Sequence, residues 1–136
     1  MRIAICFAGQ PRCFKAGYEF YKKNLFDQYP DQVDVFIHTW DGPWVQEIID
    51  LYKPTVIKVD EPLTGNFDEK YKDNTPDRSK WPPRVTVSSY YSIFEASYLK
   101  IKHESRHVEY DWVIKTRTDF ALNARIPFDA LNRKDV

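Results

Sequence analysis

Four short apolar runs, separated by helical patterns or by breaks, constrain the fold more than any other feature of this 136-residue sequence. The run from Ile3 to Gly9 is apolar at consecutive positions rather than at alternate ones. Similar runs lie at residues 33–40, 55–59 and 112–120. Uninterrupted apolar runs of this length are typical of strands covered on both faces, and such strands belong to parallel sheets.

Helical patterns occupy the stretches between these runs. Apolar residues recur at near-helical spacing through residues 16–29 and again through 44–52. Asp41 is placed to cap the second of these helices. A third helix is expected to begin at Ser88 or Ser89, either of which could cap it.

The third expected helix carries a stripe of large apolar side chains. Tyr91, Phe94, Tyr98 and Ile101 lie three or four residues apart and so share one side of a helix. A stripe of this kind usually faces the core. We therefore expect these four side chains to pack against the sheet.

Strands that alternate with helices predict an α/β fold with right-handed crossovers. We expect a three-layer, Rossmann-like sheet of about four parallel strands in the order 3-2-1-4, forming one domain over residues 1–136. Residues 60–86 interrupt the pattern, because they lack apolar periodicity and are rich in Pro, Asp, Asn, Lys and Glu. This stretch is expected to be an irregular insertion, either a surface loop or a functional lid.

Composition excludes several classes of protein. The 20 Lys and Arg residues balance 20 Asp and Glu residues, so the chain lacks the basic excess that nucleic-acid binding requires, and we expect no nucleic-acid partner. No run approaches the length of a membrane span, which predicts a cytoplasmic protein without one. The two cysteines, Cys6 and Cys13, form neither a disulfide framework nor a set of metal ligands.

The chemistry-bearing residues follow the predicted strands. Ligands of open parallel sheets bind beside the carboxyl ends of the strands. The sequences there are Gly9-Gln10-Pro11-Arg12, His38-Thr39-Trp40-Asp41 and Arg117-Thr118-Asp119. In an extended strand, residues two apart face the same side, so Arg117 and Asp119 are expected to project together.

Arg12 could bind phosphate oxygens beside the glycine turn. The other candidate side chains each have a ligand-binding and a structural interpretation. Asp41 could accept a hydrogen bond from ribose or could cap a helix. His38 could reach a ligand or could be satisfied within the core. Arg117 and Asp119 could bind a ligand or could pair with each other.

The same motifs carry a family resemblance. Gly9-Gln10-Pro11-Arg12 after the first strand, Asp34 to Trp40, Tyr90-Tyr91-Ser92 and Tyr110 to Phe120 resemble, in order and spacing, glycosyltransferase-like proteins with the GT-A fold. The resemblance implies the nucleotide-binding, N-terminal half of that fold. It also implies a nucleotide-diphospho-sugar as the donor of a sugar.

The resemblance assigns a role to each candidate residue. Gly9, Gln10 and Arg12 would line the nucleotide and its diphosphate, with Thr39, Asp41 and Arg117 as further substrate-binding residues. Asp119 would hold Mn²⁺ or Mg²⁺, since it matches the second Asp of the Asp-x-Asp motif of the family. Arg117 stands where the first Asp would be, and its guanidinium could neutralise the departing diphosphate.

The acceptor-binding half of the GT-A fold has no counterpart in residues 123–136. We expect that half to come from a partner chain, to lie outside this sequence, or to have been lost. Two functions therefore stay open. One is a glycosyltransferase or its donor-binding portion, and the other is a non-catalytic module that binds a nucleotide sugar or forms a homo-oligomer.

Overall fold

A computed structural model describes residues 1–72, 82–106 and 108–131. Its centre is a sheet of four parallel strands in the order β3-β2-β1-β4, which confirms the predicted fold class and strand order. The strands are β1 (Ile3–Ala8), β2 (Val33–Trp40), β3 (Val56–Asp60) and β4 (Trp112–Thr116).

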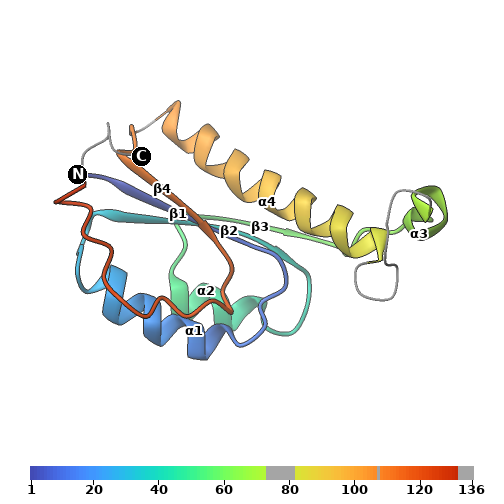
Figure 1. Cartoon of the computed structure of the whole chain (residues 1–136), viewed down its shortest axis with the longest axis horizontal. Coiled ribbons are helices and arrows are strands. Elements are labelled where there is room, and N and C mark those ends of the chain that lie inside the picture. Colours follow the sequence, from blue (N-terminus) through green and yellow to red (C-terminus); the bar gives the residue numbers. More distant parts are fainter. Residues whose placement is uncertain (73–81, 107, 132–136) are drawn as a thin grey trace.

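Helices cover both faces of this sheet (Figure 1). On one face lie α1 (Phe14–Tyr21), the π-helix η1 (Lys22–Phe26) and α2 (Val45–Tyr52). On the other face lies the long helix α4 (Pro83–Glu104), which packs mainly on β1 and β2, while the short helix α3 (Phe67–Lys70) lies beyond its first turn. No helix in the part of the chain that the structure describes has the length and apolar character needed to cross a bilayer.

Strand β1 separates two apolar cores. Ile3, Ile5 and Phe7 point to the α1 and α2 side, whereas Ala4 and Cys6 point to α4. All five are buried, as expected for a central strand with helices on both faces. Burial raises the pKa of the Cys6 thiol to about 11, so this cysteine is a small, unreactive core residue.

Two predicted helix starts are wrong. Helix α4 begins at Pro83, because Pro82 is extended and Pro83 supplies the fixed φ that suits the first helical position. Asp41 does not cap α2, whose N-terminal flank is Trp44 and has no side-chain cap. The helix start at Pro83 and helix α3 both fall inside the expected insertion at 60–86, of which residues 73–81 lie outside the described residues.

The last strand is shorter than the sequence indicates. We predicted a strand over residues 112–120, but β4 ends at Thr116 and the chain then turns, with the Phe120 N–H donating to the Arg117 carbonyl at 3.3 Å. Arg117 and Asp119 therefore lie in a turn rather than on one face of a strand. The buried Thr118 between them anchors this turn to the body of the protein.

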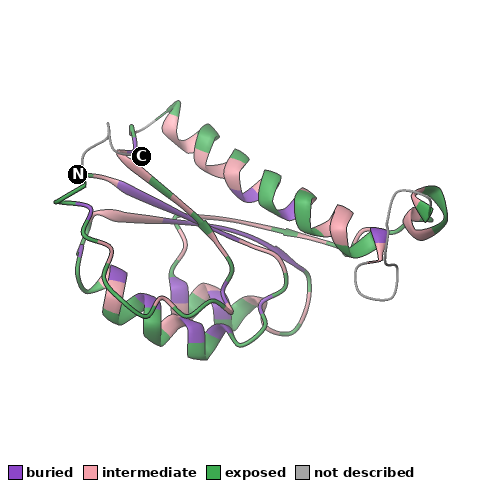
Figure 2. Ribbon diagram, viewed as in Figure 1, coloured by how far each residue is buried: buried purple, intermediate pink, exposed green. Residues whose placement is uncertain are grey.

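The predicted orientation of the α4 stripe is wrong for three of its four residues. Tyr91 is half-buried and packs on His38 and Trp40 of β2, as predicted, but Phe94, Tyr98 and Ile101 are exposed. In its middle turns α4 buries the small Ser92 and Ala96. Figure 2 shows exposed residues along the side of α4 that points away from the sheet. Small residues let the helix approach the sheet closely, and Phe94, Tyr98 and Ile101 face outward.

Close packing also fixes α1 against the turn after β4. A Cβ atom on Gly17 would lie 1.8 Å from the carbonyl oxygen of Thr118, so only glycine allows this approach. The Tyr21 hydroxyl donates to the Arg117 carbonyl at 3.0 Å and lies 2.8 Å from the Thr116 hydroxyl. The position of the Arg117–Asp119 turn thus depends on α1.

We predict that Gly17→Ala destabilises the protein by about 1–3 kcal/mol, because the added methyl group overpacks a backbone contact. Replacing glycine by alanine inside a helix ordinarily stabilises by about 0.5–1 kcal/mol, so the sign of the change is diagnostic. Urea denaturation followed by circular dichroism measures it. Ala16→Gly at the neighbouring exposed position is the control for helix propensity and should lose only about 0.5–1 kcal/mol. A Gly17→Ala protein that is more stable than the wild type would contradict the packing.

Candidate functional site

The parallel register brings the predicted strand ends to one edge of the sheet. Ala8 pairs with His38, Phe7 pairs with Thr116, and Trp40 pairs with Asp60. The segments that follow β1, β2, β3 and β4 consequently leave the sheet side by side. We call this carboxyl edge the candidate site, because ligands of open α/β sheets bind there.

The turn after β1 presents a glycine and an exposed arginine. Gly9 has φ of 101°, a conformation that side chains other than glycine rarely adopt. Its N–H donates to the Ser92 hydroxyl at 2.6 Å, so this backbone donor is already used within the protein. Among the described residues, the exposed Arg12 guanidinium donates to no group but the Gln10 side-chain oxygen, at 3.1 and 3.2 Å, and it lies at the surface beside the turn.

The turn after β4 holds Arg117 and Asp119 together. Arg117 donates from Nε to one carboxylate oxygen of Asp119 at 2.9 Å and from Nη2 to the other at 2.7 Å. The carboxylate raises the pKa of the guanidinium, which therefore stays charged. Arg117 and Asp119 thus pair with each other. A ligand that binds Arg117 must displace Asp119, and a ligand that binds Asp119 must displace Arg117.

A hollow of about 220 Å³ lies between α4 and the carboxyl ends of β1 and β4. Its floor is apolar, and Phe120 and Ile93 form part of its walls. Two cations, Lys115 and Arg117, also line it. Lys115 is exposed and makes no ion pair with any residue that the structure describes, so the hollow combines apolar walls with a positive charge that no described carboxylate neutralises. Its lining residues are Cys6, Ala8, Ile93, Ala96, Ser97, Lys115, Thr116, Arg117 and Phe120.

His38 is buried at the same edge with both ring nitrogens satisfied. Nδ1 lies 2.6 Å from the Ser92 hydroxyl, and Nε2 lies 3.1 Å from a carboxylate oxygen of Asp60. A carboxylate only accepts hydrogen bonds, so in the neutral ring Nε2 carries the proton and Nδ1 accepts from Ser92. The Ser92 oxygen in turn accepts from Gly9. This chain of hydrogen bonds ties β3, β2, α4 and the glycine turn together, and it confirms the structural interpretation of His38.

Asp60 collects further donors at the end of β3. Tyr91 donates to its carboxylate at 2.9 Å, and the Lys58 ammonium lies 2.9 Å away and also bonds Glu95 at 2.8 Å. Partial burial acts to raise the pKa of Asp60, but the hydrogen bonds from Lys58, Tyr91 and His38 outweigh it and lower the pKa. Asp60 is not among the predicted site residues, although its position at the end of a predicted strand is a signal that could have identified it.

The remaining predicted residues lie in different environments. Asp41 is exposed, and its carboxylate accepts from the N–H of Gly42 at 2.9 Å. Thr39 is buried, and its hydroxyl has no hydrogen-bond partner among the described residues. By the alternation along β2, Thr39 points to the α1 and α2 side and His38 points to α4. At the carboxyl edge, the exposed predicted residues are therefore Gln10, Arg12, Asp41 and Arg117, whereas Thr39 is buried.

The expected metal fits these side chains poorly. Both carboxylate oxygens of Asp119 accept from Arg117. Within residues 1–72, 82–106 and 108–131, no three His, Cys, Asp or Glu side chains gather closely enough to hold an ion. Mn²⁺ and Mg²⁺ prefer several oxygen ligands, whereas one carboxylate already paired with a guanidinium supplies few.

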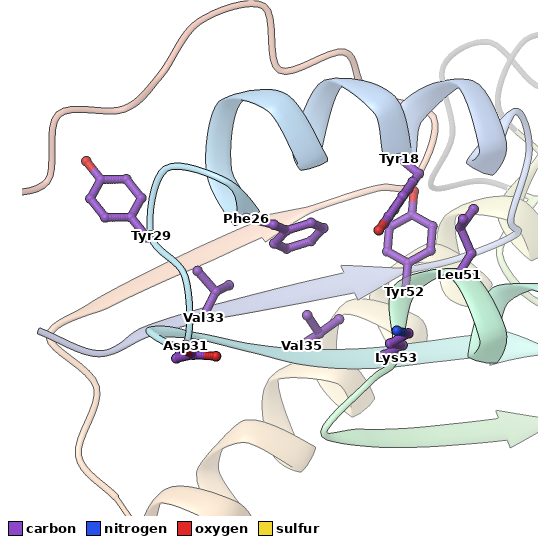
Figure 3. A pocket seen from close by; sticks show the side chains of 9 residues that line it. All are labelled: Tyr18, Phe26, Tyr29, Asp31, Val33, Val35, Leu51, Tyr52 and Lys53. Atoms are coloured by element: carbon purple, nitrogen blue, oxygen red, sulfur yellow. The ribbon is translucent and has the colours of Figure 1, made fainter.

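A second hollow of about 220 Å³ lies at the opposite end of β2, between the α1–η1 segment and α2. Figure 3 shows the rings of Tyr18, Phe26 and Tyr52 lying over Val33 and Val35 of the strand. This hollow contains none of the predicted site residues, and it lies away from the carboxyl ends of the strands. The candidate site is therefore confined to the carboxyl edge.

Comparison with known proteins adds no identity: no family model, no curated protein and no solved structure matches this chain. The fold and the side chains at the carboxyl edge therefore define the protein as an α/β, Rossmann-like domain with a cationic hollow beside two strand ends.

We predict that the buried His38 makes stability depend on pH. Burial, opposed in part by Asp60, lowers the pKa of His38 below its ordinary value of 6.5. The unfolded chain therefore binds a proton at higher pH than the folded protein does. The stability contributed by neutral His38 is complete above pH 6.5 and is lost as the pH falls through the lower, folded-state pKa. Urea denaturation at several pH values from 5 to 8 should show a falling free energy of unfolding on the acid side.

The matched variant is His38→Gln, which keeps a polar side chain but cannot titrate. This variant should be less stable at pH 8, because a buried hydrogen-bond chain is broken. Its free energy of unfolding should fall less steeply than that of the wild type between pH 6.5 and pH 5. Parallel pH profiles for the two proteins would contradict the assignment of the effect to His38.

Proposed function

We propose that the carboxyl edge binds a nucleotide-diphospho-sugar, and that the chain is a glycosyltransferase or its donor-binding portion. The observation that carries this proposal is the hollow beside β1 and β4, where Lys115 and Arg117 line a partly apolar surface. Arg12 adds a second solvent-facing guanidinium at the same edge. A diphosphate carries negative charge that such cations bind well, and guanidinium groups bind phosphate oxygens in pairs.

Each residue would have a distinct role in binding the donor. Arg12, Lys115 and Arg117 would bind the diphosphate, and Arg117 would exchange its contact with Asp119 for phosphate oxygens. That positive charge would favour departure of the nucleoside diphosphate as the sugar–phosphate bond breaks. Gly9, held in place through Ser92 and His38, would keep the backbone close enough to the ligand for these contacts. Gln10 orients Arg12, and Asp41 would reach a ribose hydroxyl from the neighbouring strand end.

The proposed binding of the diphosphate needs no metal ion, because Asp119 is paired with Arg117 and the cations are side chains. The Mn²⁺ or Mg²⁺ implied by the resemblance to GT-A proteins would require Asp119 to release the guanidinium of Arg117, and Asp119 would then be its one carboxylate ligand from this turn. Binding of the diphosphate and binding of a metal ion by Asp119 are therefore separate properties that can be measured separately.

A second candidate function has an observation in its favour. The exposed apolar face of α4 suits a non-catalytic module that binds a nucleotide sugar or associates with itself. Mass-spectrometric detection of donor hydrolysis or sugar transfer separates the two functions. Turnover of the donor supports the enzyme, and binding without turnover supports the module.

We predict that UDP or GDP at millimolar concentration raises the melting temperature by a few degrees, because a ligand that binds only the folded state stabilises it. Differential scanning fluorimetry measures the shift. Arg117→Gln should lose most of it. The matched control is Arg125→Gln, since Arg125 forms a similar exposed pair with Asp129 at 2.8 Å and lies against Tyr29, away from the carboxyl edge. The proposal fails if neither nucleotide shifts the wild-type transition.

The metal experiment repeats the nucleotide titration with and without Mn²⁺ in the wild type and in Asp119→Ala. If Asp119 is a metal ligand, Mn²⁺ enlarges the wild-type shift and the variant loses only that increment. If the shift is the same with and without Mn²⁺, the cationic side chains bind the diphosphate by themselves. The second result would refute the role of Asp119 as a metal ligand and would leave the role of Arg117 intact.

A further inference from the structure

Helix α4 carries a continuous apolar face that nothing in the described structure covers. Six residues at helical spacing form this face, which we call the outer face of α4. All are exposed except Ser97, which is half-buried, and none is charged. They are Tyr90, Ile93, Phe94, Ser97, Tyr98 and Ile101.

The outer face lies nearly opposite the side of α4 that packs on the sheet. Ser92 and Ala96 are the side chains that α4 buries in its middle turns, and at 100° per residue they lie on the far side from Tyr90, Phe94 and Ile101. Figure 2 shows exposed positions along the length of α4. Within the described residues, the fold of one copy therefore leaves this face uncovered.

The exposed area is large for a protein of this size. Aromatic side chains offer roughly 150–250 Å² each. With Tyr90 71% exposed, Phe94 61%, Ile101 53%, Ile93 44% and Tyr98 40%, the face amounts to about 500 Å². Full burial of two such faces would remove roughly 1,000 Å² from solvent, which reaches the lower bound for a specific interface. The formal charge of zero adds no net repulsion between copies.

The order of residues on the outer face is self-complementary in an antiparallel arrangement. If two α4 helices cross with the symmetry axis between residues 95 and 96, Tyr90 faces Ile101 of the other copy and Ile93 faces Tyr98. Phe94 then faces Ser97, whose small side chain leaves room for the ring. The flanking Lys102, which lies 4.4 Å from the Tyr98 ring, faces the uncharged Ser89. No like charges meet, and an isologous contact of this kind closes on itself as a dimer.

We propose that the outer face of α4 is a homodimer interface, in which two copies of this chain pair their α4 helices in antiparallel orientation. The occupant of the face is a second copy, because the exposed area reaches that of a specific interface when fully buried and because the reversed helix places Phe94 against the small Ser97. This proposal is independent of donor binding, since it needs neither the cationic hollow nor a nucleotide.

Size-exclusion chromatography with light scattering tests the stoichiometry. We expect the wild type to be a dimer at concentrations on the order of 100 μM and Phe94→Glu to be a monomer at the same concentration. The matched control is Phe20→Glu, which places the same charge at an exposed phenylalanine on α1 and should stay dimeric. Circular dichroism confirms that both variants are folded. A monomeric wild type, or a Phe94→Glu variant that remains dimeric, overturns the proposal.

Cross-linking tests the orientation. Tyr90→Cys and Ile101→Cys are made separately in a Cys13→Ser background, where the buried Cys6 stays protonated and unreactive. A short bis-maleimide should link the two variants when they are mixed but should link neither variant to itself. In the antiparallel pair, the two copies of residue 90 lie roughly 16 Å apart along the helix axis. Efficient self-linking of each variant indicates a parallel pair, and no linking in the mixture indicates another interface. Both results overturn the proposal.

Discussion

The structure depends on burial of β1 on both of its faces. Ile3, Ile5 and Phe7 require an apolar layer on one side, and Ala4 and Cys6 require one on the other. Helices on both faces need crossover connections, so the strands run parallel and end at one edge. The site follows from this constraint, because the turns after β1 and β4 can meet only when their strands are parallel neighbours. Hydrophobic burial in the middle of the sheet thus determines where the polar chemistry lies.

A single buried polar chain then organises that edge. Once His38 lies inside the protein, both of its ring nitrogens need partners, since an unsatisfied buried polar group is costly. Ser92 and Asp60 supply them, and Ser92 also accepts from Gly9. The glycine turn is held firmly as a result, but its N–H is no longer available to a ligand. The proposed recognition of an anion at this edge would therefore depend on side-chain cations rather than on a free backbone donor at Gly9.

The sequence predicted the sheet because apolar runs report burial on both faces, and that signal is local. It failed where tertiary contacts decide the outcome. The end of β4 is set by the contact between Gly17 and Thr118, two residues about a hundred positions apart, and no pattern near residue 117 reveals it. The pairing of Arg117 with Asp119 was considered, yet its two-point geometry depends on the turn. Asp60 was missed because the rule that strand ends carry the site was applied to three strands and not to β3.

The wrong prediction for α4 has a physical origin that bears on both proposals. Helical periodicity shows that large apolar residues share a side, but it does not show which side meets the sheet. Ala4 and Cys6 of β1 are small, and the small Ala96 packs on them, so the helix lies close to the sheet, while Phe94, Tyr98 and Ile101 remain outside. The same close approach makes α4 a wall of the cationic hollow, through Ala96, Ile93 and Ser97. Because Ile93 and Ser97 also belong to the outer face, a second copy would stiffen this wall. A dimer contact on α4 and an anion in the hollow would therefore act on one helix from adjacent sides, although neither contact requires the other.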